Sequence, residues 1–180
     1  GSPAAGRALY FAQLISAALA AFLLRAAFRD ERPLMAAPPA PGGGGPISRA
    51  VGQVLSIGGY MVFFAILGNA LAEHLGPAWK APVMSVMEMT GAARAISEMA
   101  LPQAWKLSFL GAACCFGGAS ICGQSLDHLR PLGIGTLEYG AAKLMHAALN
   151  FWTLQALFNR QYIPLGAAFF ACLGLSIYTS

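Results

Sequence analysis

The apolar segment from Val51 to Ala72 constrains this chain more than any other feature of its sequence. At 1.5 Å per residue, a helix of this length reaches across a hydrocarbon core of about 30 Å. Of the 180 residues, 57% are hydrophobic and 10% are charged, whereas ordinary soluble domains have about 45–50% and about 25%. Because a helix satisfies its own backbone hydrogen bonds in lipid, these features predict an all-α membrane protein.

Other apolar segments stand on both sides of this one. They are Ala8–Leu24, Leu107–Leu126, Glu138 to about Phe158, and Ile163–Tyr178, the last of which is short for a span. Arginines at 25, 29, 32 and 49 flank the loop after the first segment and predict that this loop is cytoplasmic. We expect a multi-pass protein with four to five transmembrane helices and one re-entrant or interrupted helical segment.

The stretch from Pro33 to Pro46 is made almost entirely of proline, glycine and alanine. Such a sequence neither holds a helix nor buries a core, so it predicts a flexible linker. We therefore divide the chain into a first transmembrane helix at 1–32, a linker at 33–48 and a membrane domain at 49–180.

Glu88 is a carboxylate set among apolar neighbours. An acidic group at the centre of a membrane helix costs roughly 2.5–3.5 kcal/mol, so it faces a protein interior or a wet cavity. The segment Pro82–Leu101 is too short and too polar for an independent span, which predicts a re-entrant or half-depth helix. Ser85 shares the helix face of Glu88, while Arg94 and Glu98 are four residues apart and can pair with each other.

A second unusual stretch, Phe116–Gln124, lies inside the apolar segment Leu107–Leu126. Its three glycines, serine and glutamine predict an unwound helix whose freed amides could meet a polar ligand. The alternative is close helix packing through small residues. No P-loop lysine and no complete G-x-G-x-x-G follow, so a nucleotide fingerprint is absent.

Two helices carry polar stripes. In the last long helix the polar residues recur at steps of four, three, four and three: Tyr139, Lys143, His146, Asn150 and Thr153. They predict a site lining, with Lys143 as the counter-charge of Glu88 if the two helices meet. The alternative is that Lys143 snorkels to the interface and the others bond helices together. A shorter stripe, Gln53, Ser56 and Tyr60, is better explained by such interhelical bonds.

The sequence lacks the residues that several classes of function require. The four cysteines form no C-x-x-C or disulfide framework, and the methionines around Glu88 lack the convergent ligands of a metal site. The net charge of +4 is concentrated beside one apolar segment, which indicates topology and not nucleic-acid binding. No H-E-x-x-H or G-x-S-x-G is present. We expect no enzyme activity, no catalytic residue, no metal and no cofactor.

Five short motifs carry a resemblance to a known family. They are Phe-Leu-Leu-Arg at 22–25, Gly-Gly-Tyr-Met-Val-Phe-Phe at 58–64, Glu-Met-Thr-Gly at 88–91, Phe-Gly-Gly-Ala-Ser with a following Gln at 116–124, and Lys-Leu-Met-His at 143–146. In this order they resemble the C-terminal half of the sporulation integral membrane protein YlbJ family, in the nucleoside-recognition or Gate-domain group. The resemblance covers most of the chain. It implies a multi-pass inner-membrane protein needed for spore formation, with a fold related to inverted-repeat transporters.

The chain departs from that family in two respects: the preceding repeat is missing, and the linker is unusually long. If the chain is complete, a two-repeat transport site would have to be built by dimerisation. The partners we expect are the lipid bilayer, a small polar solute, and either a second copy or the preceding repeat.

Two functions follow as hypotheses. The first is a Gate-type permease or binder of a small polar solute, and the second is a membrane scaffold on which other sporulation proteins dock. For the first, the candidate binding residues are Ser85, Glu88, Thr90, Gly91, Gly117, Gly118, Ser120, Gln124, Lys143, His146 and Asn150.

Overall fold

The computed structural model describes residues 2–27 and 45–159, and this part of the chain is helical with no strand. The long helices are α1 (Pro3–Ala27), α2 (Pro46–Leu75) and α7 (Thr136–Phe158). The shorter ones are α3 (Lys80–Met87), α4 (Met89–Glu98), α5 (Gln103–Phe116) and α6 (Gly118–Leu129), with 3-10 turns at Pro77–Trp79 and Arg130–Leu132. The predicted span Ile163–Tyr178 and most of the predicted linker lie outside the described residues, while α2 already begins at Pro46.

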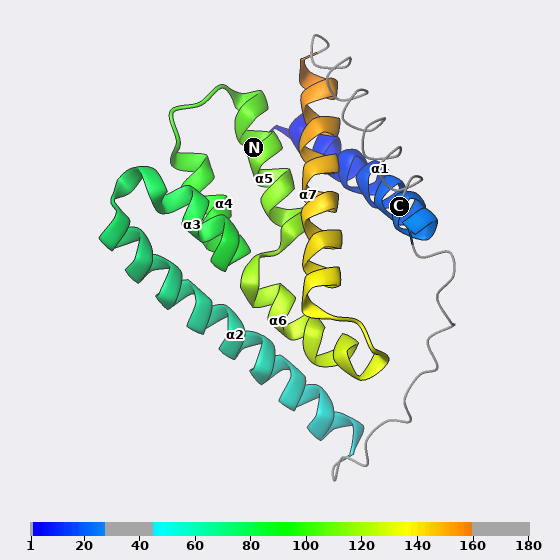
Figure 1. The fold of residues 1–180 in the computed structure, drawn as a ribbon. Helices are drawn as coiled ribbons and strands as arrows, with labels where there is room; N and C mark the ends of the chain where they lie inside the picture. Colours follow the sequence, from blue (N-terminus) through cyan, green and yellow to red (C-terminus); the bar gives the residue numbers. More distant parts are fainter. Residues whose placement is uncertain (1, 28–44, 160–180) are drawn as a thin grey trace.

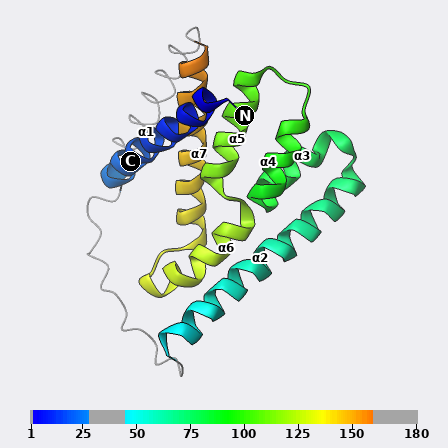
Figure 2. The ribbon, with the colours of Figure 1, turned by 180° about the vertical axis from the view of Figure 1, so that it is seen from behind.

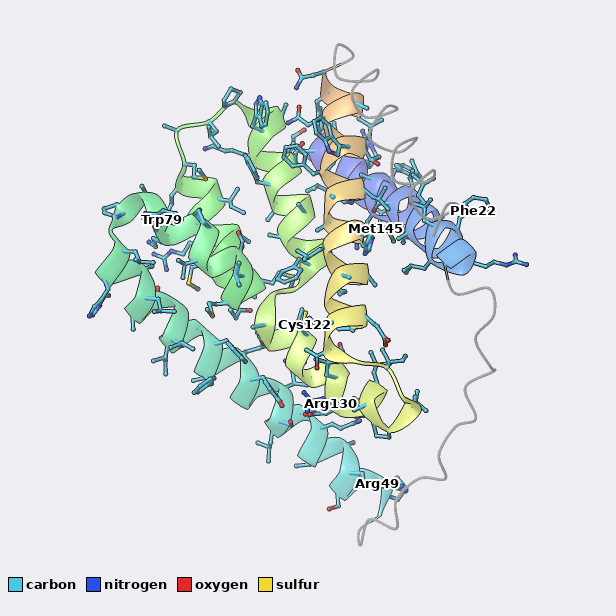
Figure 3. The ribbon with its side chains drawn as sticks, viewed as in Figure 1. Phe22, Arg49, Trp79, Cys122, Arg130 and Met145 are labelled. Atoms are coloured by element: carbon cyan, nitrogen blue, oxygen red, sulfur yellow. The ribbon has the colours of Figure 1, made fainter. Side chains whose placement is uncertain are left out.

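Three stretches of the described chain are long and apolar enough to cross a membrane: Pro3–Arg25, Pro46–Leu75 and Gln103–Leu132. The predicted all-α class is therefore confirmed, together with several helices of membrane-spanning length. Arg49 and Arg130 lie toward one end of the molecule and Trp79 lies toward the other (Figure 3).

The helices α3 and α4 form a short hairpin that enters and leaves on the same side. Lys80, the first residue of α3, places its Nζ 3.5 Å from Oε2 of Glu98, the last residue of α4. Between the two helices Glu88 is extended, with φ −152° and ψ 126°. The hairpin has the shape predicted for a re-entrant segment, and the predicted pair of Arg94 and Glu98 is confirmed at 3.2 Å.

The predicted interruption of the Leu107–Leu126 segment is also confirmed. The helix stops at Phe116 and starts again at Gly118, and both glycines between the axes have positive φ, 82° at Gly117 and 70° at Gly118. Residues with a Cβ rarely adopt this conformation, so the glycines allow the break. Gly117 falls at the midpoint of the Gln103–Leu132 stretch, which places the break halfway along a span.

The helices are arranged around α5. In Figures 1 and 2, α7 runs beside α5, α1 crosses one face of α7, and α4 lies on the other side of α5. The helix α2 forms the outer edge and contacts the short helices α3 and α6. A small apolar core joins the hairpin to α5 and consists of Ala81, Met84, Ala92, Ala95, Ile96 and Ala113.

Candidate functional site

Glu88 is buried, with 3% of its surface exposed, at the tip of the α3–α4 hairpin. It is the N-cap residue of α4: its Oε2 accepts a hydrogen bond from the backbone N–H of Gly91 at 2.9 Å. The hydroxyl of Thr90 donates to the same oxygen. A carboxylate at a helix N-terminus is stabilised by the orphan amides and by the helix dipole. The fold therefore accommodates Glu88 with neutral donors.

The breaks of the two interrupted segments touch each other. A Cβ built on Gly118 would lie 2.9 Å from the carbonyl carbon and oxygen of Met87 and 3.0 Å from the backbone nitrogen of Glu88. The first turn of α6 thus packs directly on the turn between α3 and α4. Because Gly117 lies at the midpoint of the Gln103–Leu132 stretch, Glu88 lies beside that midpoint.

Two helices begin at this crossing, and only one is capped by a side chain. The N-terminus of α4 has Glu88, whereas α6 starts at Gly117 with no side-chain cap. Ser120, in the first turn of α6, is fully buried, and Gln124 Nε2 lies 3.4 Å from its hydroxyl. The first turn of α6 therefore has backbone amides that no side chain caps.

The polar stripe of α7 faces α1 in part. Nε2 of His146 lies 3.2 Å from Ser16 Oγ, and Asn150 Nδ2 donates to that oxygen at 3.1 Å. Cys115 of α5 donates through its thiol to Gln13 Oε1 at 3.0 Å. These contacts support the alternative that His146 and Asn150 bond helices together. The sequence interpretation missed Gln13 and Ser16; their spacing of three on one helix face was the available signal.

The predicted pairing of Glu88 with Lys143 is wrong. In the described residues α5 stands between α4 and α7, and Lys143 forms no ion pair there. Instead Lys143 lies near Cys115, Cys122 and His146, at the junction of α5, α6 and α7. The prediction depended on the two helices meeting, and they do not.

The remaining candidate residues divide between the crossing and single helices. Gly91 and Thr90 contact Glu88 directly, and Gly117 and Gly118 form the break against it. Ser85 instead donates to the carbonyl of Ala81 within α3, at 2.8 Å.

A polar cleft of about 410 Å³ opens between α2 and α6. It is lined by Gly52, Gln53, Ser56, Ile57, Gln124, Ser125, Asp127 and His128. One turn beyond Ser56, the Tyr60 hydroxyl donates to Asp127 Oδ2 at 2.9 Å, and its ring packs on Gly123. The stripe predicted on α2 therefore binds α6 through Tyr60 and lines this cleft through Gln53 and Ser56.

The described residues contain no group of three or more His, Cys, Asp or Glu side chains that could hold a metal ion. Together, the fold and the site define an all-helical protein with helices of membrane-spanning length and two interrupted segments that cross at a buried carboxylate. No known protein family, curated protein or solved structure matches the chain.

Proposed function

We propose that this protein is a permease or binder of a small polar solute in the cell inner membrane, of the Gate (nucleoside-recognition) type and associated with sporulation. The contact between Gly118 and the Met87–Glu88 backbone carries the proposal. Secondary transporters bind solutes near midplane between discontinuous helices, whose half-helix ends supply dipoles and backbone groups. The YlbJ-like motifs support the sporulation and inner-membrane parts of the proposal.

The crossing offers complementary groups to a solute. Glu88 supplies an acceptor, or takes up a proton, because its carboxylate is held by neutral donors alone among the described residues. The uncapped first turn of α6 supplies amide donors. A second copy of the chain, or a preceding repeat, would supply the other half of an inverted-repeat site.

Reconstituted vesicles test the proposal. We expect the wild-type chain to take up at least one of radiolabelled uridine, glutamate and phosphate. Alternatively, the addition of one of these solutes should cause protons to enter pyranine-loaded vesicles. Glu88→Gln keeps an acceptor oxygen for Gly91 and removes the charge, so we expect the initial rate to fall at least about tenfold. Glu73→Gln is the matched control, since Glu73 is an exposed carboxylate on α2, away from the crossing.

Uptake by Glu88→Gln at the rate of Glu73→Gln would contradict the role of Glu88. Absence of uptake and of proton movement with the wild-type chain would remove the permease. Folded yield is measured for each variant by gel filtration in detergent, so that loss of protein is separated from loss of flux.

The second candidate is the scaffold, and one observation favours it: His146 and Asn150 are used in holding α7 to α1. If these polar groups only hold helices together, helix packing explains their burial and no bound solute is required. A scaffold predicts no flux, normal spore formation with Glu88→Gln, and a partner protein recovered by cross-linking in sporulating cells.

A further inference from the structure

One face of α4 is entirely polar and exposed. The opposite face, with Ala92, Ala95 and Ile96, is buried against the hairpin and α5. The exposed residues follow one another at helical spacing: Thr90, Arg94, Ser97 and Glu98.

This face runs from the depth of Glu88 to the open end of the hairpin. Since Glu88 packs on the midpoint of the Gln103–Leu132 stretch, α4 starts at about half depth. The ten residues of α4 span about 15 Å, which is half of a hydrocarbon core of about 30 Å. The polar face of α4 is therefore at hydrocarbon depth over most of its length.

Hydrocarbon is an unfavourable environment for this face. A face that suits lipid is found on α2, where the exposed residues are apolar: Val62 and Phe63 are 60% exposed and Ile66 is 66% exposed. On α4, by contrast, the side chain of Arg94 is 81% exposed. Polar and charged groups in hydrocarbon are costly unless they meet water or a polar partner.

The exposed face is connected to the buried carboxylate. Thr90 is exposed, and its hydroxyl donates to Glu88 Oε2. Glu88 is thus one hydrogen bond away from the α4 surface, although it is itself buried. Gly118 of α6, which packs on the backbone of Glu88, brings no charge.

The open end of the hairpin carries an excess of cations. Lys80 and Arg94 both contact Glu98, and Lys106 of α5 donates to the backbone carbonyl of Ser97 at 2.8 Å. Three cations with one carboxylate in this contacting cluster create a positive potential, which raises the local concentration of anions.

We propose that the polar face of α4 is the wall of a water-filled vestibule, which leads from the hairpin's open end to Glu88 and favours small anions over cations. The vestibule gives the solute of the proposed function, on which this proposal rests, a route to the site, and it identifies that solute as a small anion. Water covers this face, and the opposite wall of the vestibule belongs to the second copy or the preceding repeat of the proposed function.

Cysteine labelling in lipid vesicles tests the vestibule. Thr90→Cys and Ser97→Cys are compared with Val62→Cys, which is also exposed in the isolated chain but lies on the apolar face of α2. The probes are the membrane-impermeant thiol reagents sulfonatoethyl methanethiosulfonate, an anion, and trimethylammonioethyl methanethiosulfonate, a cation, supplied on both sides of the bilayer. Adducts are counted by intact mass, with the wild-type chain as the baseline for its native cysteines.

We expect Ser97→Cys and Thr90→Cys to be modified and Val62→Cys to stay unmodified. At Ser97→Cys, whose backbone carbonyl accepts a hydrogen bond from Lys106, the anionic reagent should react on the order of threefold faster than the cationic one, after each rate is normalised to free cysteine. The added change Arg94→Gln should reduce that ratio. If Thr90→Cys does not accumulate, Arg94→Cys provides the deep position.

Three results would overturn the inference. They are protection of Thr90→Cys in vesicles that is lost in SDS, a disulfide-linked dimer through Thr90→Cys, or a normalised ratio of one or less. Labelling does not require transport, so its outcome is separate from that of the flux experiment. The expected labelling in the absence of flux would contradict the permease and support the vestibule.

Discussion

Gly118 lies directly on the backbone of Glu88, so that a single methyl group at position 118 would stand 3.0 Å from the Glu88 nitrogen. This contact joins the α3–α4 hairpin to the break between α5 and α6. The two irregular parts of the chain therefore stabilise each other, and neither break is a local defect.

Gly118→Ala should be strongly destabilising. The change costs about 1–2 kcal/mol for a Cβ at positive φ, and overpacking against Met87 adds about 1–3 kcal/mol. Gly133→Ala is the matched control, because Gly133 has φ 84° but nothing within 4 Å of the added Cβ. The free energy of unfolding, measured by SDS titration in mixed micelles, should fall further for Gly118→Ala. Equal losses for the two variants would show that the crossing is not tightly packed.

The sequence was sufficient to predict the two irregular segments. Glu88 stands out because a carboxylate in an apolar stretch is costly, and Gly117 and Gly118 stand out because two adjacent glycines interrupt a helix. Both signals are local, since each depends on residues within one turn of the feature. The all-helical class followed from apolar length in the same way.

The contacts between helices could not be predicted in this way. Lys143 has the right charge for Glu88, but the sequence does not reveal that α5 lies between their helices. Glu88 instead finds its donors two and three residues away, at Thr90 and Gly91, where a helix N-cap provides them. The pairing of Ser16 with Asn150 spans 134 residues, so the spacing of Gln13 and Ser16 on one helix face indicates a polar edge but not its partner.

Gly111→Ala should destabilise the protein even though alanine favours helix. A Cβ at Gly111 would lie 2.3 Å from Asn150 Oδ1 and 2.5 Å from Leu154 Cδ1, so these buried side chains, or α7 with them, would have to shift. Overpacking of this kind costs about 1–3 kcal/mol. Gly140→Ala in α7 has open space and should gain up to about 1 kcal/mol from helix propensity. Opposite shifts of the thermal midpoint are expected, and a gain in both variants would contradict the close approach of α5 and α7.

The ion pairs that close the hairpin should respond to acid. The hydrogen bond from Arg94, together with nearby Lys80, holds the pKa of Glu98 below its ordinary value. Because the pKa of Glu98 is lower in the folded state than in the unfolded state, the ion pairs stabilise the fold at pH values above the unfolded pKa, near 4.3. This stabilisation is lost as the pH falls through the folded pKa. The thermal midpoint of wild type should exceed that of Glu98→Gln at pH 7 and converge with it below about pH 4. High salt should shrink the difference at pH 7, since Glu98 is exposed. A difference that persists in acid would contradict the assignment.

Ser16 holds α1 to α7 through one oxygen, and Ser16→Ala should weaken that contact. Its hydroxyl donates to the carbonyl of Gln13 at 3.1 Å and accepts from Asn150 Nδ2 at 3.1 Å, in a fully buried position. Removing the oxygen leaves a buried amide without a partner, which costs about 1–3 kcal/mol. The matched control is Ser108→Ala: Ser108 is equally buried, but its hydroxyl donates only to the Ala104 carbonyl of its own helix, so no buried donor is orphaned. We expect a lower unfolding midpoint for Ser16→Ala and a change within about 0.5 kcal/mol for Ser108→Ala. Similar midpoints for both variants would mean that α1 is held by apolar contact alone.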